Sequence, residues 1–88
     1  MKTRQPKNHD LSKSKLIRII SSNVKHYRMI RDISQETLAE YANLHRNSIC
    51  LLEKGELNLT LTTLESISEA LNITAIQLLS NTILTTKK

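Results

Sequence analysis

The side chains best suited to chemistry lie between residues 35 and 55, where the chain reads QETLAEYANLHRNSICLLEKG. Arg46 and Asn47 are neighbours in this stretch, and Lys54 stands near its end. A guanidinium can donate two parallel hydrogen bonds to a planar acceptor edge, whereas a carboxamide can both donate and accept. These residue types therefore suit non-covalent recognition of polar edges and phosphates rather than the making of bonds.

The sequence lacks the spacing of a catalytic or metal site. His9, His26, His45 and Cys50 do not have the spacing of zinc ligands, and no pair of base and nucleophile recurs. The lone Cys50 excludes an intramolecular disulfide and suits a reducing cytosol. It could act as a redox sensor, but an inert thiol is favoured because nothing in the sequence marks its thiolate as activated. We expect no enzyme activity, no catalytic residue, no metal, no cofactor and no small-molecule ligand.

Two short helices separated by a tight turn must position the polar side chains. Ser34 is a good N-cap, which predicts a helix over 35–42. Asn43 follows where the chain must turn, and asparagine tolerates a left-handed backbone better than most residues do. A further helix fits 46–54, and Gly55 gives a plausible stop.

Helices so close in sequence must cross closely, and Ala39 supplies the small residue that this crossing requires. The wedge expected between the helices consists of Leu38, Leu44, Ile49 and Leu52. The face of the later helix that is left outward consists of Arg46, Asn47, Cys50, Leu51 and Lys54. A projecting helix with hydrogen-bonding side chains fits the major groove of DNA, where the base edges are distinguishable. The alternatives are an ordinary solvated face for Arg46 and Asn47, and a place in the core for Leu51.

Three more helices are expected around this pair, so the predicted fold class is all-α with five helices. The first covers about 14–31, since apolar residues recur there at steps of three and four: Leu16, Ile20, Val24, Tyr27 and Ile30. Thr60 can cap a helix over 61–71, whose inward residues would be Leu61, Leu64, Ile67, Ala70 and Leu71. Thr74 opens the last helix with a capping box to Gln77.

Length and charge predict one domain with basic ends. A chain of 88 residues with one Gly and one Pro argues against β-rich folds and glycine-rich phosphate loops. The net charge is +5, and residues 1–15 hold five Lys or Arg against one Asp, whereas residues 16–86 hold six against seven acidic residues. We therefore expect a flexible basic arm over 1–13, a domain over 14–80 and a tail over 81–88. The arm either contacts the DNA backbone or is an inert leader.

No apolar run approaches the roughly 18 residues of a membrane span, and no secretion signal follows the basic start. The prediction is a cytoplasmic protein with no membrane partner.

These features resemble the phage repressor/Cro (Xre-type) helix-turn-helix family. The matching residues, between about Val24 and Leu79, are Ser34-Gln35-x-x-Leu38-Ala39, Ile49-x-x-x-Glu53-Lys54-Gly55, Leu64 and Ala70-Leu71. Within the family, the length and the stretch Asn58-Leu59-Thr60 are most similar to the controller proteins of restriction–modification systems. The resemblance implies a five-helix lambda-repressor-like domain and a regulator of transcription, such as a repressor, that binds double-stranded DNA.

The resemblance also implies roles for individual residues. The positions that match base contacts are Arg46, Asn47 and Leu51. The positions that match contacts to the DNA backbone are Gln35, His45, Lys54, Asn58 and Thr60. Arg28 and Glu53 match a structural ion pair that joins the first helix to the third. The chain departs from the family in His45, where Ser or Thr usually caps the reading helix, and in Asn43, where Gly is usual.

A surplus of apolar residues near the end of the chain predicts a homodimer. The residues concerned are Ile73, Ile76, Leu78, Leu79, Ile83 and Leu84, of which Ile73, Ile76 and Leu79 are assigned to the interface. A two-fold interface would set two reading helices one turn of DNA apart, ~34 Å, and would require a palindromic operator. The alternative is that all six residues pack within the monomer.

The other functional hypothesis is an antitoxin or a small phage-type repressor that acts partly through a protein partner. The short stretch after Leu79 disfavours it, because wrapping a partner would need a longer extension.

Overall fold

The computed structural model describes residues 10–81, and within this range every regular element is a helix. The elements are the 3-10 helix η1 (Leu11–Lys13) and the α-helices α1 (Lys15–Ile30), α2 (Gln35–Ala42), α3 (Arg46–Glu53), α4 (Leu61–Ala70) and α5 (Ala75–Leu79). The all-α class with five α-helices is thereby confirmed. Most of the predicted arm and tail lies outside the described residues, but the last part of the arm forms η1.

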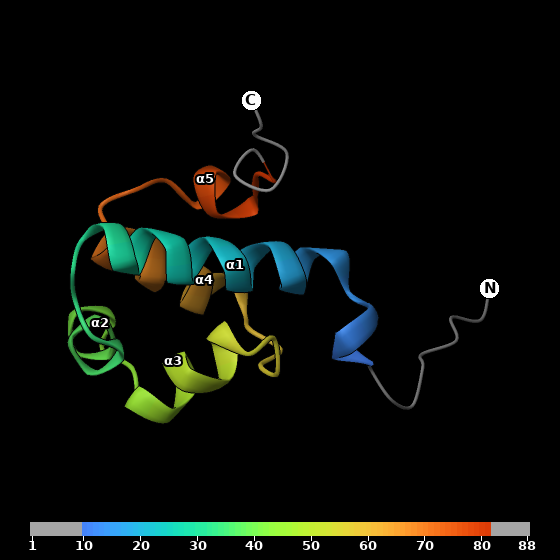
Figure 1. Cartoon of the computed structure of the whole chain (residues 1–88), viewed down its shortest axis with the longest axis horizontal. Coiled ribbons are helices and arrows are strands. Elements are labelled where there is room, and N and C mark those ends of the chain that lie inside the picture. Colours follow the sequence, from blue (N-terminus) through green and yellow to red (C-terminus); the bar gives the residue numbers. More distant parts are fainter. Residues whose placement is uncertain (1–9, 82–88) are drawn as a thin grey trace.

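The long helix α1 divides the molecule into two sides (Figure 1). The pair α2 and α3 lies on one side of α1, and α5 lies on the opposite side. Helix α4 packs against α2 and α5. Consequently α1 contacts both the helix-turn-helix pair and the last helix. None of the helices between residues 10 and 81 is long and apolar enough to cross a membrane.

Side-chain caps fix where three of the helices begin. Ser34, Thr60 and Thr74 precede α2, α4 and α5, and each hydroxyl accepts a hydrogen bond from the backbone N–H three residues later, at 3.0, 3.1 and 3.1 Å. Thr74 also forms the predicted capping box, since Gln77 accepts a hydrogen bond from its backbone N–H at 2.9 Å. These contacts satisfy N–H groups that have no partner within their helices.

Left-handed residues end several helices. Asn43 (φ 58°) and Gly55 (φ 76°) follow α2 and α3 as predicted, and Asn72 (φ 60°) follows α4. Asp32 (φ 58°), after α1, adopts the same conformation and was not predicted. Short polar side chains tolerate this region because they can hydrogen-bond locally.

The core lies where α1 meets α2, α3, α4 and α5. Its buried residues are Ile20, Val24, Leu38, Ala39, Ala42, Ile49, Leu52, Leu64, Ile67, Leu71 and Leu78. Leu16 and Ile30 belong to the apolar repeat that predicted α1, but they are 56% and 58% exposed, and the buried apolar residues of the helix are Ile17, Ile20 and Val24. Adjacent helical residues point about 100° apart, so a shift of one residue moves a side chain off the core.

Leu61 was predicted to face inward, but 79% of it is exposed. It is the first residue of α4, and the buried face of that helix starts at Leu64. Ala70 is half-buried against the core.

Candidate nucleic-acid interface

The turn between α2 and α3 is built from backbone contacts around two residues. Ala39 is buried at the crossing of the helices, and its carbonyl accepts a hydrogen bond from Leu44 N–H at 2.8 Å. Asn43 supplies the left-handed step between them. The predicted wedge is confirmed, since Leu38, Ile49 and Leu52 are fully buried and Leu44 packs against the same core.

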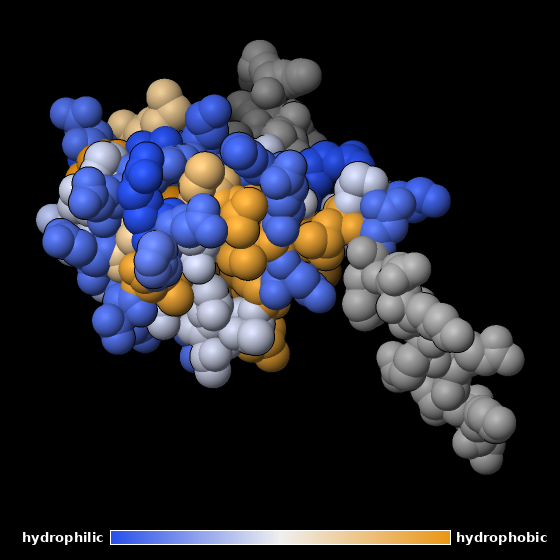
Figure 2. All heavy atoms as spheres, turned by 90° about the horizontal axis from the view of Figure 1, so that it is seen from below, coloured by the Kyte–Doolittle hydropathy of each residue, from blue (hydrophilic) through white to orange (hydrophobic). Residues whose placement is uncertain are grey.

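This packing leaves one face of α3 open to solvent. Arg46 and Asn47 are exposed, and their side chains make no hydrogen bond or ion pair with any other residue between 10 and 81. Cys50 and Leu51, which were predicted on the outward face with a place in the core as the alternative for Leu51, are half-buried, because they lie at the border between the open face and the core. Figure 2 views the molecule from the α3 side and shows mainly hydrophilic residues around smaller hydrophobic areas. Arg46 and Asn47 are thus free to meet a ligand without unfolding the domain.

A network of side chains holds α3 against the helices before it. Arg28 donates from Nε to Glu53 Oε2 at 2.6 Å and from Nη2 to Glu53 Oε1 at 3.1 Å. Its Nη1 donates to the Ile33 carbonyl at 2.8 Å, and Gln35 Nε2 donates to Glu53 Oε1 at 3.0 Å. The predicted ion pair therefore forms, and Gln35 supports it from the start of α2. The side chains of Arg28 and Glu53 are 14% and 5% exposed.

The charge on Arg28 is protected by this arrangement. The hydrogen bonds to Glu53 and the negative charge of its carboxylate raise the pKa of Arg28, although burial acts in the opposite direction. Because a buried charge that loses its partner is costly, the pair stabilises the contact between α1 and α3.

His45 caps α3. Its Nδ1 accepts a hydrogen bond from Asn47 N–H at 3.3 Å, so a neutral ring in this geometry carries its proton on Nε2. The distance is long for such a bond, which agrees with histidine being a weaker cap than Ser or Thr. The outer edge of the exposed ring is left as a donor at the beginning of α3.

We predict that His45→Ser stabilises the fold, because a serine hydroxyl can reach the same N–H groups at a shorter distance. The expected gain in free energy of unfolding is about 0.5–1 kcal/mol. Thermal unfolding followed by circular dichroism measures it, with Ser48→Ala on the same helix as the control. A lower stability for His45→Ser would contradict the assigned cap.

The remaining candidate backbone contacts lie at and beyond the end of α3. Lys54, Asn58 and Thr60 are all exposed. The Thr60 hydroxyl is already engaged in capping α4, at 3.1 Å from the N–H of Thr63.

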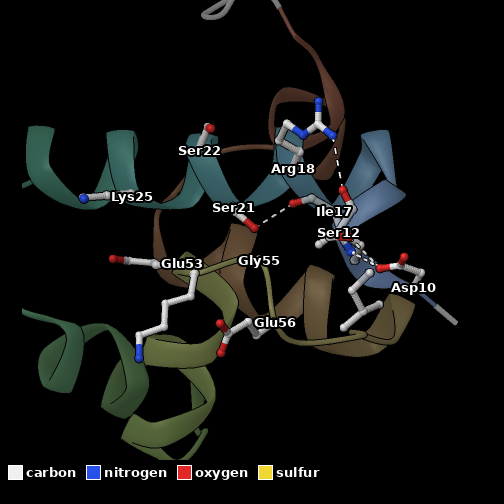
Figure 3. A pocket seen from close by; sticks show the side chains of 12 residues that line it. Asp10, Ser12, Ile17, Arg18, Ser21, Ser22, Lys25, Glu53, Gly55 and Glu56 are labelled. Carbon is white, nitrogen blue, oxygen red and sulfur yellow. Dashed lines mark hydrogen bonds between the residues drawn. The ribbon is translucent and has the colours of Figure 1, made fainter.

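A groove of about 770 Å³ lies between the start of α1 and the end of α3 (Figure 3). Its charged lining residues are of both signs: Asp10, Arg18, Lys25, Glu53, Lys54 and Glu56. In the described range, no three residues among His, Cys, Asp and Glu come together as metal ligands. Both signs of charge line the groove, and one of the carboxylates, that of Glu53, is already paired with Arg28.

The predicted dimer residues differ in exposure. Ile76 is 76% exposed and Leu79 is 37% exposed on α5, whereas Ile73 is half-buried and packs against the core. Ile83 and Leu84 lie outside the described residues. Asn23 and Arg31, which were not predicted as site residues, join α1 and its C-cap to the segment around α5. The signal for Asn23 was a polar residue inside the apolar repeat of α1, next to Val24.

Comparison with known proteins agrees with this geometry. The family model described as Helix-turn-helix matches residues 24–78. The control protein C.SmaI of Serratia marcescens is 45% identical over 62 residues, which cover 70% of this chain and 74% of that protein. The crystal structure of the wild-type restriction–modification controller protein C.Esp1396I has a TM-score of 0.74 and 32% identity, and the match covers 83% of this chain and 100% of that chain.

The same controller protein has been solved as a tetramer in complex with its natural 35 base-pair operator. That structure has a TM-score of 0.70 and 32% identity, with coverage of 75% of this chain and 87% of that one. The chain therefore belongs to the helix-turn-helix family and, within it, to the restriction–modification controller proteins.

Proposed function

We propose that this protein is a sequence-specific transcription regulator that binds double-stranded operator DNA as a homodimer and controls the genes of a restriction–modification system. The observation that carries the proposal is the open face of α3, on which the side chains of Arg46 and Asn47 have no hydrogen-bond or ion-pair partner among residues 10–81. The relation to C.Esp1396I, which has been crystallised on its operator, supports DNA as the ligand.

In this proposal, three side chains of α3 contact bases in the major groove. Arg46 donates two hydrogen bonds to O6 and N7 of a guanine, and Asn47 forms hydrogen bonds with an adenine or a phosphate. Leu51 is half-buried, so its exposed part meets a thymine methyl group from the edge of the helix.

Contacts to the DNA backbone are proposed on both sides of α3. On one side, the free N–H groups at the start of α2, beside Gln35, suit a phosphate. His45 offers its outer ring N–H, while Lys54, Asn58 and the start of α4 at Thr60 lie near the next phosphates. These contacts fix the register of α3 without reading sequence.

The proposed dimer forms through the exposed side of α5. Ile76 and Leu79 present apolar surface that the rest of residues 10–81 leaves exposed, and Ile73 packs against the core beneath them. Two-fold symmetry then requires a palindromic operator whose half-sites are about 34 Å apart. Helix α5 lies on the side of α1 opposite to α3 (Figure 1), so in this proposal the dimer interface and the helix that reads the bases are on opposite sides of α1.

We further propose that the protein acts in the cytoplasm and has no catalytic activity. In this proposal the chain consists of an arm (1–13), a domain (14–80) and a tail (81–88). The positive charge of residues 1–15 suits the DNA backbone.

Footprinting on the DNA upstream of the protein's own gene tests the function. We expect protection of a palindromic site, and a scrambled duplex of equal length should bind far more weakly at moderate salt. Equal affinity for both duplexes would contradict sequence-specific binding.

Lys54→Gln should weaken binding to all operator variants alike, because a lysine on a phosphate carries no sequence information. The slope of log K against log salt concentration should become shallower by about 0.9 per subunit. Fluorescence anisotropy at several salt concentrations measures the slope. An unchanged slope would remove Lys54 from the proposed backbone contacts.

A further inference from the structure

A fully buried asparagine of α1 binds the end of α5. The Nδ2 of Asn23 lies 2.8 Å from the Leu78 carbonyl, 2.7 Å from the Ser80 carbonyl and 3.3 Å from the Gln77 carbonyl. Asn23 itself is 0% exposed. Since the last carbonyls of a helix lack partners within it, this side chain satisfies acceptors that α5 cannot satisfy alone.

The contact uses the donor side of the amide. Within the described range, Asn23 Oδ1 is buried and has no hydrogen-bond partner. A buried acceptor without a partner is unfavourable, so the acceptor oxygen of Asn23 does not explain why an asparagine is buried here. The amide group is held there for its N–H donors.

Helix α5 depends on such external contacts. It has five residues, Ala75–Leu79, far fewer than a helix needs to be stable alone in water. At the other end of the same segment, Arg31 donates from Nε to the Leu71 carbonyl at 2.8 Å and from Nη2 to the Asn72 carbonyl at 3.4 Å. Asn23 of α1 and Arg31, the C-cap residue of the same helix, thus hold the segment 71–80 at both ends.

Helix α1 also holds the reading helix. Five residues after Asn23, Arg28 binds Glu53 of α3 on the other side of α1. One rigid helix therefore carries the contacts that fix α3 and the contacts that fix α5.

We propose that Asn23 is a positioning residue that sets the dimer surface of α5 relative to the reading helix, and so sets the separation of half-sites that the dimer accepts. The proposal rests on the proposed function, because it takes the exposed side of α5 as the dimer interface. Asn23 acts through α5 and touches neither DNA nor the partner subunit in this account.

The test compares Asn23→Asp with wild type, and uses Ser21→Ala as a matched control. Aspartate keeps the shape but removes the donors and places its oxygens against three carbonyls. Ser21 lies nearby on α1, and its hydroxyl bonds within that helix, to the Ile17 carbonyl at 2.7 Å. Sedimentation should give a dimer dissociation constant about tenfold higher or more for Asn23→Asp, as expected for lost hydrogen bonds. Ser21→Ala should match wild type.

A second readout separates positioning from simple stability. Operators with the half-sites moved apart by one base pair are titrated at protein concentrations that keep each variant dimeric. A lower folded fraction of the variant would weaken its binding to operators of all spacings alike. An altered position of α5 should instead reduce the ratio of affinities for the native and the altered spacing by about threefold or more. An unchanged dissociation constant and an unchanged spacing preference would overturn the proposal.

If Asn23→Asp loses its helical circular dichroism, Asn23→Ser takes its place, because serine is neutral and too short to bind the three carbonyls. It should weaken dimerisation measurably, about threefold, and no change would overturn the proposal. Ile76→Asp separates the two levels. If the Ile76→Asp protein stays dimeric, the proposed dimer interface on α5 is wrong. If Ile76→Asp abolishes the dimer but Asn23→Asp changes neither dimerisation nor spacing preference, only the positioning role of Asn23 is refuted.

Discussion

Glu53→Ala is expected to lower the free energy of unfolding by about 3–5 kcal/mol, because it strands the guanidinium of Arg28 in a largely buried place. The carboxylate accepts two hydrogen bonds from Arg28 and one from Gln35, so all three are lost together. A small domain has only about 5–15 kcal/mol of stability in total. The variant should therefore be partly unfolded under mild denaturing conditions.

Urea denaturation followed by circular dichroism measures this effect, and Glu56→Ala is the control. Glu56 is exposed and forms no ion pair among residues 10–81, so its removal should change stability by less than about 0.5 kcal/mol. The double change Arg28→Met with Glu53→Leu should recover much of the loss, since it removes both charges. A loss below about 1 kcal/mol for Glu53→Ala would place the pair among ordinary surface ion pairs.

Ile76→Asp should have the largest effect on DNA binding. The change would put a charge without a partner into the proposed two-fold interface, and the symmetry would bring two such charges together. We expect the dimer dissociation constant to rise by roughly a hundredfold or more, corresponding to about 3 kcal/mol. Operator affinity should fall steeply, because each subunit would then bind its half-site without the help of the other.

Sedimentation and operator titration measure both consequences. Tyr41→Asp is the matched control, since Tyr41 is also an exposed hydrophobic residue but lies on α2, away from α5. It should leave dimerisation unchanged. A protein that stays dimeric after Ile76→Asp would exclude the exposed side of α5 as the interface.

Local sequence signals predicted most of the fold. Ser34, Thr60 and Thr74 each act as a cap through contacts within one turn, so their role does not depend on distant packing. Asn43 likewise adopts the predicted left-handed conformation. Such features are readable from neighbours in the chain alone.

The orientation of helices was harder to predict. Leu16 and Leu61 fit the apolar repeats of their helices, but both are exposed. The first buried residue is Ile17 in α1 and Leu64 in α4. The register of a buried face is decided by which other helices pack on it, and periodicity alone does not contain that information. Asn23 was missed for the same reason, because its partners lie more than 50 residues away in the chain.

The open face of α3 was predicted in part. The exposure of Arg46 and Asn47 follows from the wedge on the other side of the helix. The half-burial of Leu51 depends on how closely the neighbouring segments approach, which the sequence does not reveal. Roles for single residues on DNA came from the family resemblance rather than from physical pattern.

The most direct test of the central claim is a titration of wild type and Arg46→Ala against a set of operators, each with one base pair replaced in both half-sites. If α3 reads bases through Arg46, the variant should lose about 1–3 kcal/mol of discrimination at one position per half-site and keep the wild-type pattern elsewhere. If the Arg46→Ala protein ranks the operators by affinity in the same order and with the same differences as wild type, the claim that α3 reads bases through Arg46 is contradicted.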